Sequence, residues 1–299
     1  MKKILLYCNF GKYPITDYRK GLYNTLDRNK KVELGHVPLG GNKFALKYNA
    51  FNPDIVISIK GWIPEKLKRK NCIFIHLQCD DPDEFFNHEP HMKEFDYWFT
   101  NSKWSELFQH HKNGYKKVKT CAFAQDQKFF EKVPFNKLFE HDVMFAGHHI
   151  PYRHSFLNGL AGLDVGVYGS GWRESCVGFT GKKLIDMNYF MALKSSKMCI
   201  DFSLSGSNYL NVKEKTFEIT GVGSLLLCNQ FSEMRLYYKY DKECVGFVNE
   251  KDLREKVDYY LEHEDEREEI AKAGRKRFLK DHTWEKRLKY VFKECNIKL

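Results

Sequence analysis

Uninterrupted apolar runs alternate with stretches of mixed polarity along the first half of the chain. The runs cover residues 4–10, 32–39, 54–59, 72–79, 97–100 and 118–123. Several are apolar throughout, which is typical of parallel strands covered on both faces. Helices are expected between them at residues 18–29 and 103–112, the second with a cap at Asn101-Ser102. This order of elements predicts a doubly wound α/β sheet.

The same alternation begins again after a linker with a short helix at residues 125–140. Strands are predicted at residues 143–146, 165–168, 198–202, 225–228 and 245–248. Helices are predicted at residues 153–160, 213–220 and 253–262, followed by a helical tail from 265 to 298. The prediction is therefore an α/β fold of two doubly wound, Rossmann-like domains that face each other across a cleft. Ligands of such sheets bind beyond the carboxyl ends of the strands.

The composition fits a globular protein of two domains. The chain has 299 residues, of which 42% are hydrophobic and 29% charged, and this length suits two domains of about 150 residues each. No apolar stretch approaches the ~20 residues of a membrane span. The start, MKKILLYCNF, is too short for a signal peptide. The nine cysteines form no CxxC pair, which indicates free thiols in a reducing compartment and predicts a cytoplasmic protein.

The net charge of +10 has two interpretations. It favours polyanionic partners such as nucleotide phosphates, nucleic acid or an acidic membrane surface. It also fits a plain enrichment in scattered lysines, which requires no such partner.

Polar residues follow two predicted strands of the first domain, where ligands would bind. Gly11 lies in the loop after the first strand, but no GxGxxG pattern is present, so the nicotinamide and flavin fingerprint is missing. His76, Asp80 and Asp81 lie at the end of the fourth run, where a His or Asp is placed to orient a sugar hydroxyl or take its proton. The aspartates also fit a cation site or a turn that caps a helix.

Two histidines farther along the first domain are interpreted as loop residues. His88 and His91 lie three residues apart, but Pro90 between them disfavours a regular helical pair of ligands.

A glycine turn opens the second domain and leads into a helix. Gly147 and His148 follow the first strand of this domain, and Arg153 lies in the opening region of the helix. Backbone N–H groups at a helix start attract phosphate, and a nearby arginine adds a bidentate partner. A second glycine turn ends at Trp172, which is predicted to pack rather than to touch a ligand.

The segment from residue 205 to 227 is the richest in candidate ligand groups. Asn208 and Asn211 lie in a polar loop before a predicted helix, and Lys215 and Glu218 lie three residues apart on one helical face. A lysine near the helix start suits a pyrophosphate, and a carboxylate one turn later suits the paired hydroxyls of a ribose. The alternative is a surface ion pair of little energetic value.

At this segment the chain resembles the glycosyltransferases of the GT-B fold. It is particularly similar to the spore-maturation CgeB group in the retaining, nucleotide-sugar-dependent branch. The resemblance extends over most of the chain from about Asn52. The segments that carry it, through their order and spacing, are PDIVISIK, IFIHLQCDDPDEF, FDYWFTNS, DVMFAGHHIPYRHSFLNGL, VGVYGSGW, KTFEITGVGSLLLCN and EREEIAKAGRKRFLKDHTWEKRLKYV.

The resemblance implies a role for each matching residue. Glu218 is expected to accept hydrogen bonds from the nucleotide ribose, with Phe217 beside it in the basic-x-Phe-Glu stretch. Lys215 is expected to neutralise the leaving diphosphate, although the group more often has arginine at this position. Gly147 and Arg153 are expected to line the phosphate end of the site.

In one position the chain departs from the family pattern. Many retaining relatives carry a second glutamate eight residues before the ribose glutamate, and this chain has Leu210 there. The contact with the donor sugar therefore stays open, with Asn208 or Asn211 as substitutes.

The resemblance also suggests how the chain is divided. An acceptor-side domain is expected at residues 1–139 and a nucleotide-sugar-binding domain at 140–282. Residues 283–299 are expected to form a helix that packs back on the first domain.

The expected function is that of a glycosyltransferase. It would move a sugar from a nucleoside diphosphate sugar, with a UDP-sugar as first choice, to a hydroxyl group with retained anomeric configuration. Basic groups and helix ends hold the leaving diphosphate in this fold, so neither a metal ion nor a tightly bound cofactor is expected. Neutralising that leaving charge would be the largest catalytic contribution. The alternative is a non-catalytic nucleotide-sugar or nucleic-acid binding module.

Two classes of acceptor stay open, and the oligomeric state is not indicated. One class is a cell-surface or spore glycan. The other is a hydroxymethylated pyrimidine in double-stranded DNA, which the net charge of +10 suits because phosphate contacts give affinity without sequence preference. Lysine clusters at residues 66–70 and 112–119 fit a duplex or are simply solvated surface.

Overall fold

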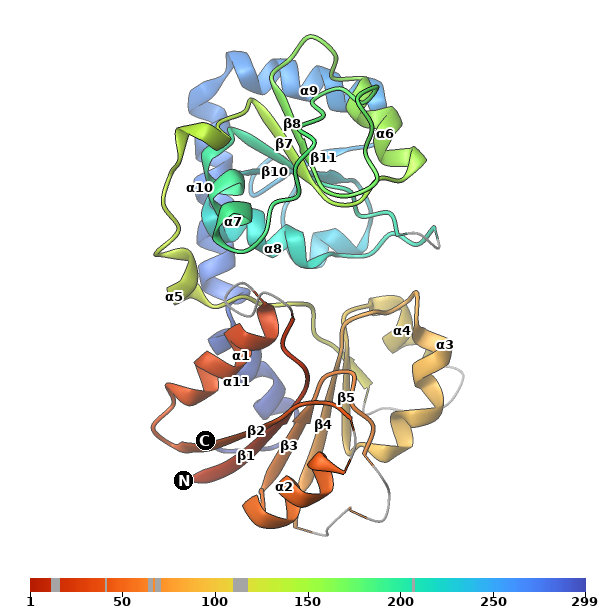
Figure 1. Ribbon diagram of the computed structural model, residues 1–299, viewed down its shortest axis with the longest axis vertical. Coiled ribbons are helices and arrows are strands. Elements are labelled where there is room, and N and C mark those ends of the chain that lie inside the picture. The colour runs from red at the N-terminus through yellow and green to blue at the C-terminus, as the bar shows by residue number, and fades with distance from the viewer. Residues whose placement is uncertain (12–16, 41, 64–66, 68–70, 110–117, 206–207) are drawn as a thin grey trace. The chain divides into compact units, whose positions relative to one another are not determined.

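The computed structural model describes residues 1–11, 17–40, 42–63, 67, 71–109, 118–205 and 208–299. The chain forms two compact units (Figure 1). Unit 1 contains Met1–Asp126 and Trp284–Leu299, and unit 2 contains Gln127–Thr283. Each unit is built on its own parallel sheet, so the predicted fold class of two doubly wound α/β domains is confirmed.

Unit 1 has a six-stranded sheet with the strand order β2-β1-β3-β4-β5-β6. All neighbouring strands are parallel. The strands are β1 (Lys2–Tyr7), β2 (Val32–Val37), β3 (Ile55–Ser58), β4 (Ile73–Gln78), β5 (Tyr97–Thr100) and β6 (Val118–Thr120). The helices are α1 (Tyr18–Asp27), α2 (Lys43–Phe51), α3 (Phe85–His88), α4 (Lys103–Phe108) and α11 (Trp284–Glu294), with a 3-10 helix at Glu89–Glu94.

The two faces of this sheet bury two separate clusters, which explains why its strands are apolar throughout. In β1, Ile4 and Leu6 belong to a cluster that also receives residues of α1 and α11. Leu5 and Tyr7 point to the other face, into a cluster with residues of α2. A strand buried on both sides has no polar face, as expected for a parallel sheet covered by helices.

Unit 2 has a five-stranded parallel sheet with the order β11-β10-β9-β7-β8. Its strands are β7 (Val143–Ala146), β8 (Val165–Tyr168), β9 (Met198–Asp201), β10 (Leu225–Asn229) and β11 (Val245–Phe247). Its helices are α5 (Gln127–Phe130), α6 (Pro151–Asn158), α7 (Met187–Ser195), α8 (Glu214–Val222), α9 (Glu250–Glu262) and α10 (Glu264–Asp281). Two 3-10 helices lie at Lys137–Phe139 and Glu233–Leu236.

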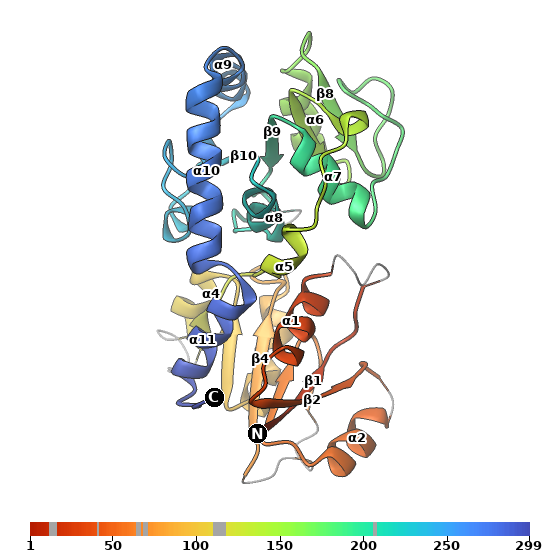
Figure 2. The same cartoon turned by 90° about the vertical axis from the view of Figure 1, so that its left-hand side faces the viewer.

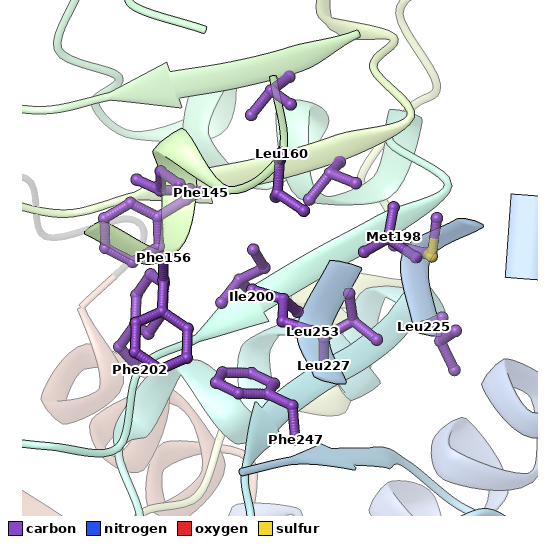
Figure 3. Close-up of a cluster of buried hydrophobic side chains, with 14 of the residues drawn as sticks. Phe145, Phe156, Leu160, Met198, Ile200, Phe202, Leu225, Leu227, Phe247 and Leu253 are labelled. Carbon is purple, nitrogen blue, oxygen red and sulfur yellow. The ribbon is translucent and has the colours of Figure 1, made fainter. Parts of the chain in front are cut away.

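The core of unit 2 is formed by side chains of the sheet and of the helices that pack on it. Phe145, Ile200 and Leu227 from three neighbouring strands meet Phe156 of α6 and Leu253 of α9 (Figure 3). The long helix α10, which stands out in Figure 2, packs against α8 and β10. This packing fixes the start of α6 and of α8 relative to the carboxyl ends of the strands.

The predicted strands are confirmed to within a few residues, but one predicted loop differs from the structure. Helix α4, expected at residues 103–112, is described over Lys103–Phe108, and residues 110–112 lie outside the described part. The loop expected around His88 and His91 is wrong, because α3 ends at His88 and a 3-10 helix follows. Pro90 starts that 3-10 helix, where its fixed φ is favourable and its missing N–H costs nothing.

Candidate active site

The order of strands in unit 2 places a topological switch point between β7 and β9, where open α/β sheets form a ligand-binding crevice. The chain passes from β7 outward to β8 on one side, and then returns to β9 on the other side of β7. The loops that follow β7 and β9 therefore leave the sheet in opposite directions. Ligands of open α/β sheets bind at such a switch point, outside the carboxyl ends of the strands.

Lys215 lies in the first turn of α8, at this crevice. Its ammonium donates to the carbonyl oxygen of Ala146 at the end of β7 and lies 4.5 Å from the centroid of the Phe145 ring. Burial lowers the pKa of Lys215, and the nearby carboxylate of Asp201 opposes that change. Lys213, the N-cap residue of α8, gives the first turn of this helix no side-chain cap.

Arg153 approaches the same ring from α6. Its guanidinium donates to the carbonyl oxygen of His148 at 2.9 Å and lies 5.5 Å from the centroid of the Phe145 ring. Burial lowers its pKa. Both cations thus donate to carbonyl oxygens, and within the described part of the chain neither forms an ion pair with a carboxylate. The start of α6 also has no side-chain cap.

Glu218 lies one turn after Lys215, so both residues lie on one face of α8, as expected from their spacing. Each influences the pKa of the other. Burial raises the pKa of Glu218 to about 7, although a hydrogen bond from Tyr189 and the charge of Lys215 oppose it. The hydroxyl of Tyr189, on α7, donates to Glu218 Oε2 at 2.7 Å. This bond fixes the carboxyl group at the edge of the crevice.

The turn that contains Gly147 is held by the loop that follows β8. The Gly147 amide donates to the carbonyl oxygen of Tyr168 at 2.9 Å. The Gly147 carbonyl oxygen accepts from the indole of Trp172 at 2.8 Å, so Trp172 packs as predicted. His148 follows, and its pKa is lowered by burial and by the charges of Arg153 and Lys215. The imidazole of His148 therefore lies near the charges of Arg153 and Lys215, which favour its neutral form.

Three other predicted residues of this segment lie in different surroundings. Asn208 is exposed, has a positive φ of 63° and follows residues 206 and 207, which are outside the described part. Asn211 is buried, and its backbone N–H donates to the Ser203 carbonyl oxygen at 3.2 Å. Phe217 is fully buried among Tyr237, Tyr238 and His282. It therefore belongs to the packing of α8 and does not face the crevice.

In unit 1, His76 is inaccessible. It is fully buried at the end of β4, with its ring stacked 4.1 Å from that of Trp98 and 5.5 Å from that of Trp62. Burial lowers the pKa of His76 to about 3. A neutral, enclosed imidazole does not fit the predicted role of taking a proton from a sugar hydroxyl, because no acceptor reaches it.

The neighbouring aspartates of unit 1 have different environments. Asp81 is fully buried and accepts from the Thr100 hydroxyl at 2.6 Å, which is the turn-stabilising alternative. Asp80 is partly exposed and forms an ion pair with Lys60 at 2.7 Å. The Gly11 amide donates to Asp17 Oδ2 at 2.5 Å, and the rest of its loop, residues 12–16, is not described. Of the three acidic and imidazole candidates, Asp80 alone stays accessible.

The cation site considered for the aspartates is not found among the described residues. In the described ranges, no three His, Cys, Asp or Glu side chains are placed to hold a metal ion together. None of the helices described is long and apolar enough to cross a membrane.

Part of the chain matches a protein family, and the whole chain resembles known structures. Residues 153–293, from α6 into α11, match the family described as "Glycosyl transferase-like". Sucrose-phosphate synthase from Thermosynechococcus elongatus has a TM-score of 0.68 at 9% identity, with 98% of this chain and 99% of that chain covered. The Anabaena protein HepE, in complex with UDP and glucose, has a TM-score of 0.68 at 11% identity, with 99% and 100% covered.

A glycosyltransferase from Rickettsia africae gives the same picture, with a TM-score of 0.59 at 10% identity and 98% and 97% of the two chains covered. No curated protein sequence shows a significant match. The structural neighbours have the GT-B fold, and this chain shares that fold with them. Residues 153–293 are similar to the glycosyl transferase-like family.

Sequence reasoning missed two residues that organise the crevice. Tyr189 holds Glu218 from α7. Asp201, at the end of β9, accepts from the Thr216 hydroxyl at 2.6 Å and so ties α8 to the sheet. The end of a strand beside a switch point is a sequence signal for Asp201. Tyr189 has no such signal, because it comes from a helix that the sequence did not predict.

Proposed function

We propose that the protein is a glycosyltransferase that transfers a sugar from a nucleoside diphosphate sugar, with a UDP-sugar as first choice, to a hydroxyl group with retained configuration. The observation that carries this proposal is the pair of cations, Lys215 and Arg153, on either side of the crevice between β7 and β9. Both donate to carbonyl oxygens rather than to carboxylates. Both also lie in the first turn of a helix whose N-cap residue forms no side-chain cap. Such a place is suited to a diphosphate.

The neighbours support the choice of donor. HepE structures contain UDP, UDP with glucose, or UDP-glucose. By analogy, the diphosphate of the donor would lie between Lys215 and Arg153, and Glu218 would accept hydrogen bonds from the ribose hydroxyls. Gly147 and His148 would lie at the phosphate end, and Asn208 or Asn211 would contact the donor sugar in place of the glutamate that Leu210 replaces.

The proposed reaction breaks the bond between the sugar C1 and the diphosphate oxygen, and forms a bond from the acceptor oxygen to C1. For retention, the acceptor approaches the face from which the diphosphate leaves, so the acceptor proton passes to a diphosphate oxygen. Lys215 and Arg153 would stabilise the negative charge that grows on the leaving group. Preorganised charges of this kind commonly give the largest contribution to catalysis.

The proposal also covers the class of acceptor and the family branch to which the protein is most similar. We keep a cell-surface or spore glycan and a hydroxymethylated pyrimidine in DNA as acceptor classes, and the CgeB group as the nearest branch. The lysine clusters that suggested DNA lie mostly outside the described residues; Lys119 is described, and its ammonium lies 3.8 Å from Glu294. If DNA is the acceptor, duplex binding should weaken steeply as salt rises.

Donor turnover tests the proposal directly. The purified protein is incubated with UDP-, GDP-, ADP- and CDP-sugars, and release of nucleotide is measured with and without a panel of acceptors. Lys215→Ala should lower turnover by roughly 100-fold, because removing one preorganised donor to the developing charge costs that much. Lys272→Ala, at an exposed lysine on α10, is the matched control and should keep full activity.

The outcomes separate the two candidate functions. Turnover that survives in Lys215→Ala would contradict the assignment of the diphosphate site. Nucleotide binding without turnover for any donor and acceptor would favour the non-catalytic binding module. Proton NMR of the product reports the anomeric configuration, and an inverted product would remove retention from the proposal.

A further inference from the structure

Unit 1 carries an exposed group of large apolar side chains that the donor site does not use. Phe86 on α3 is 62% exposed, and Trp104 and Leu107 on α4 are 40% and 44% exposed. We refer to these three residues as the aromatic patch. Exposed apolar groups that gather in one place commonly mark a binding surface, whereas single ones do not.

The aromatic patch is seated on buried rings. Phe85, which is fully buried, lies 5.2 Å from the ring of Phe86 and 5.3 Å from that of Trp104. The rings of Phe86 and Trp104 lie 6.5 Å apart in an edge-to-face arrangement. These contacts join α3 and α4, which lie side by side in Figure 1, so the two exposed rings form a preorganised surface.

The position of the aromatic patch agrees with an acceptor site. Phe86 lies in the first turn of α3, which follows β4, and Trp104 lies in the first turn of α4, which follows β5. Both therefore lie near the carboxyl ends of neighbouring strands, where open α/β sheets bind ligands. Asp80, which is partly exposed, lies in the same connection from β4 to α3.

The charges beside the aromatic patch disfavour a polyanion. Asp83 and Glu84, just before α3, are exposed carboxylates. Lys103, at the start of α4, is paired with Glu106 at 2.9 Å. Among the described residues, the surroundings of the patch are thus acidic on the α3 side and neutralised on the α4 side. Nucleic acid or an anionic membrane would be repelled by the carboxylates.

The size of the aromatic patch also limits what it binds. Three side chains are far fewer than the ~20–30 residues that each partner contributes to a stable protein interface. Aromatic faces carry negative charge density that attracts the polarised C–H groups of a pyranose ring. The amide of Asn87, which donates to Glu84 Oε2 at 2.6 Å, and the flanking carboxylates offer partners for sugar hydroxyls.

We propose that the aromatic patch binds a neutral saccharide as the acceptor, with a sugar ring stacked on Phe86 and Trp104. This inference rests on the proposed function and names the acceptor class for it. It selects the glycan over DNA among the acceptors that the sequence leaves open.

The test measures binding and transfer separately in the intact protein. The probes are neutral gluco-, manno- and N-acetylglucosamine oligosaccharides of two to six units, titrated by calorimetry. The variants are Phe86→Ala and Trp104→Ala, with Trp104→Phe as a variant that keeps a ring. Phe135→Ala in unit 2, at a phenylalanine that is 58% exposed, is the matched control. Thermal melting checks that each variant is folded.

At least one oligosaccharide should bind, and its affinity should fall roughly tenfold or more in the two alanine variants, partly in Trp104→Phe and not in Phe135→Ala. Hydrolysis of the nucleotide sugar by water should be unchanged in all of them, because the residues proposed for the donor site lie in unit 2. If no oligosaccharide binds, or if the patch variants lose binding of duplex DNA or of anionic phospholipid vesicles instead, the inference is overturned. Absent donor hydrolysis in the unaltered protein would instead contradict the proposed function, so the two failures are distinguishable.

Discussion

At the scale of single residues, the protonation state of Glu218 links donor binding to pH. Burial raises the pKa of this carboxyl to about 7, so the group is half protonated near neutrality. A carboxylate accepts two ribose hydroxyls, whereas the protonated form loses one acceptor position. We predict that UDP-glucose binds about fivefold to tenfold more weakly at pH 6 than at pH 8. Calorimetry at the two pH values measures this, and Glu218→Gln should bind weakly at both.

The same pKa has an opposite effect on folding. Because the folded state binds this proton more tightly than the unfolded chain, the stabilisation from Glu218 is present below its ordinary pKa of 4.5 and is lost as pH rises through about 7. His148 cannot produce the predicted trend in donor binding, because protonation of an imidazole beside the diphosphate would strengthen binding at low pH. Tighter binding at pH 6 would therefore contradict the role given to Glu218.

Tyr189 positions Glu218, and its hydroxyl has a measurable signature. Its hydrogen bond lowers the pKa of Glu218, so Tyr189→Phe should move the midpoint of the pH dependence of UDP-glucose binding upward. The affinity at pH 7 should fall about fivefold, since a hydrogen bond to a charged group contributes roughly 1 kcal/mol or more, while turnover at saturating donor should hardly change. Tyr259→Phe removes a comparable 2.7 Å hydrogen bond, from Tyr259 on α9 to Glu266 on α10, and is the control. If the midpoint of the pH dependence does not move in Tyr189→Phe, Tyr189 contributes to packing and does not position Glu218.

At the scale of elements, the turns that follow β7 and β8 depend on each other through a glycine. Gly169 has a φ of +137°, and a Cβ there would lie 1.9 Å from the Gly147 carbonyl oxygen. Gly169→Ala should therefore displace the turn that carries Gly147 and His148. We predict a loss of about 2–4 kcal/mol in the free energy of unfolding together with weaker UDP-glucose binding.

Gly162 provides the control for the effect of strain alone. It also has a positive φ, of +88°, but a Cβ there would meet no atom within 4 Å. Gly162→Ala should cost only about 1 kcal/mol and leave donor binding unchanged. Urea denaturation and calorimetry of both variants make the comparison. Equal effects of the two substitutions would show that the contact with Gly147 does not matter.

The strands could be predicted from the sequence, and much of the site could not. The strands are short runs buried on both faces, such as β1 with Ile4 and Leu5 in different clusters, and such runs are visible without tertiary information. Helix α7 was not predicted, because its stretch from Met187 lacks a clear helical period. Tyr189 on that helix meets Glu218 only because the chain folds back over 29 residues. Lys215 and Glu218 were found because they are neighbours on one helix.

Burial explains why some residues that were predicted to bind a ligand do not face a site in the structure. His76 and Phe217 lie in segments rich in polar or family-typical residues, but the structure encloses both among aromatic rings. A sequence shows which residue types gather at the end of a strand. It does not show which of them point inward, since one residue of register decides this. Asp80 and Asp81 are adjacent, yet Asp80 is accessible and Asp81 is buried.

At the scale of the whole molecule, both ends of the sequence belong to unit 1, and the segment between them forms unit 2. Helix α11 returns to the cluster that covers one face of the first sheet and contributes Trp284, Leu288 and Phe292 to it. The Trp284 indole donates to the Tyr18 carbonyl oxygen at 2.8 Å, and its backbone amide donates to the Gln125 carbonyl oxygen at 3.0 Å. The last residues of the sequence therefore stabilise its first element.

This arrangement predicts that stability and donor binding can be changed separately. Trp284→Ala removes a large buried side chain from unit 1 and should destabilise that unit by about 3–5 kcal/mol, while the affinity for UDP-glucose stays within about twofold. Trp172→Ala is the corresponding substitution in unit 2, where the indole of Trp172 donates to the Gly147 carbonyl oxygen. This substitution should weaken UDP-glucose binding. Differential scanning calorimetry with and without the nucleotide sugar distinguishes them. The ligand should stabilise the transition that Trp284→Ala leaves unchanged, and a single transition altered equally by both substitutions would show that the two units unfold as one.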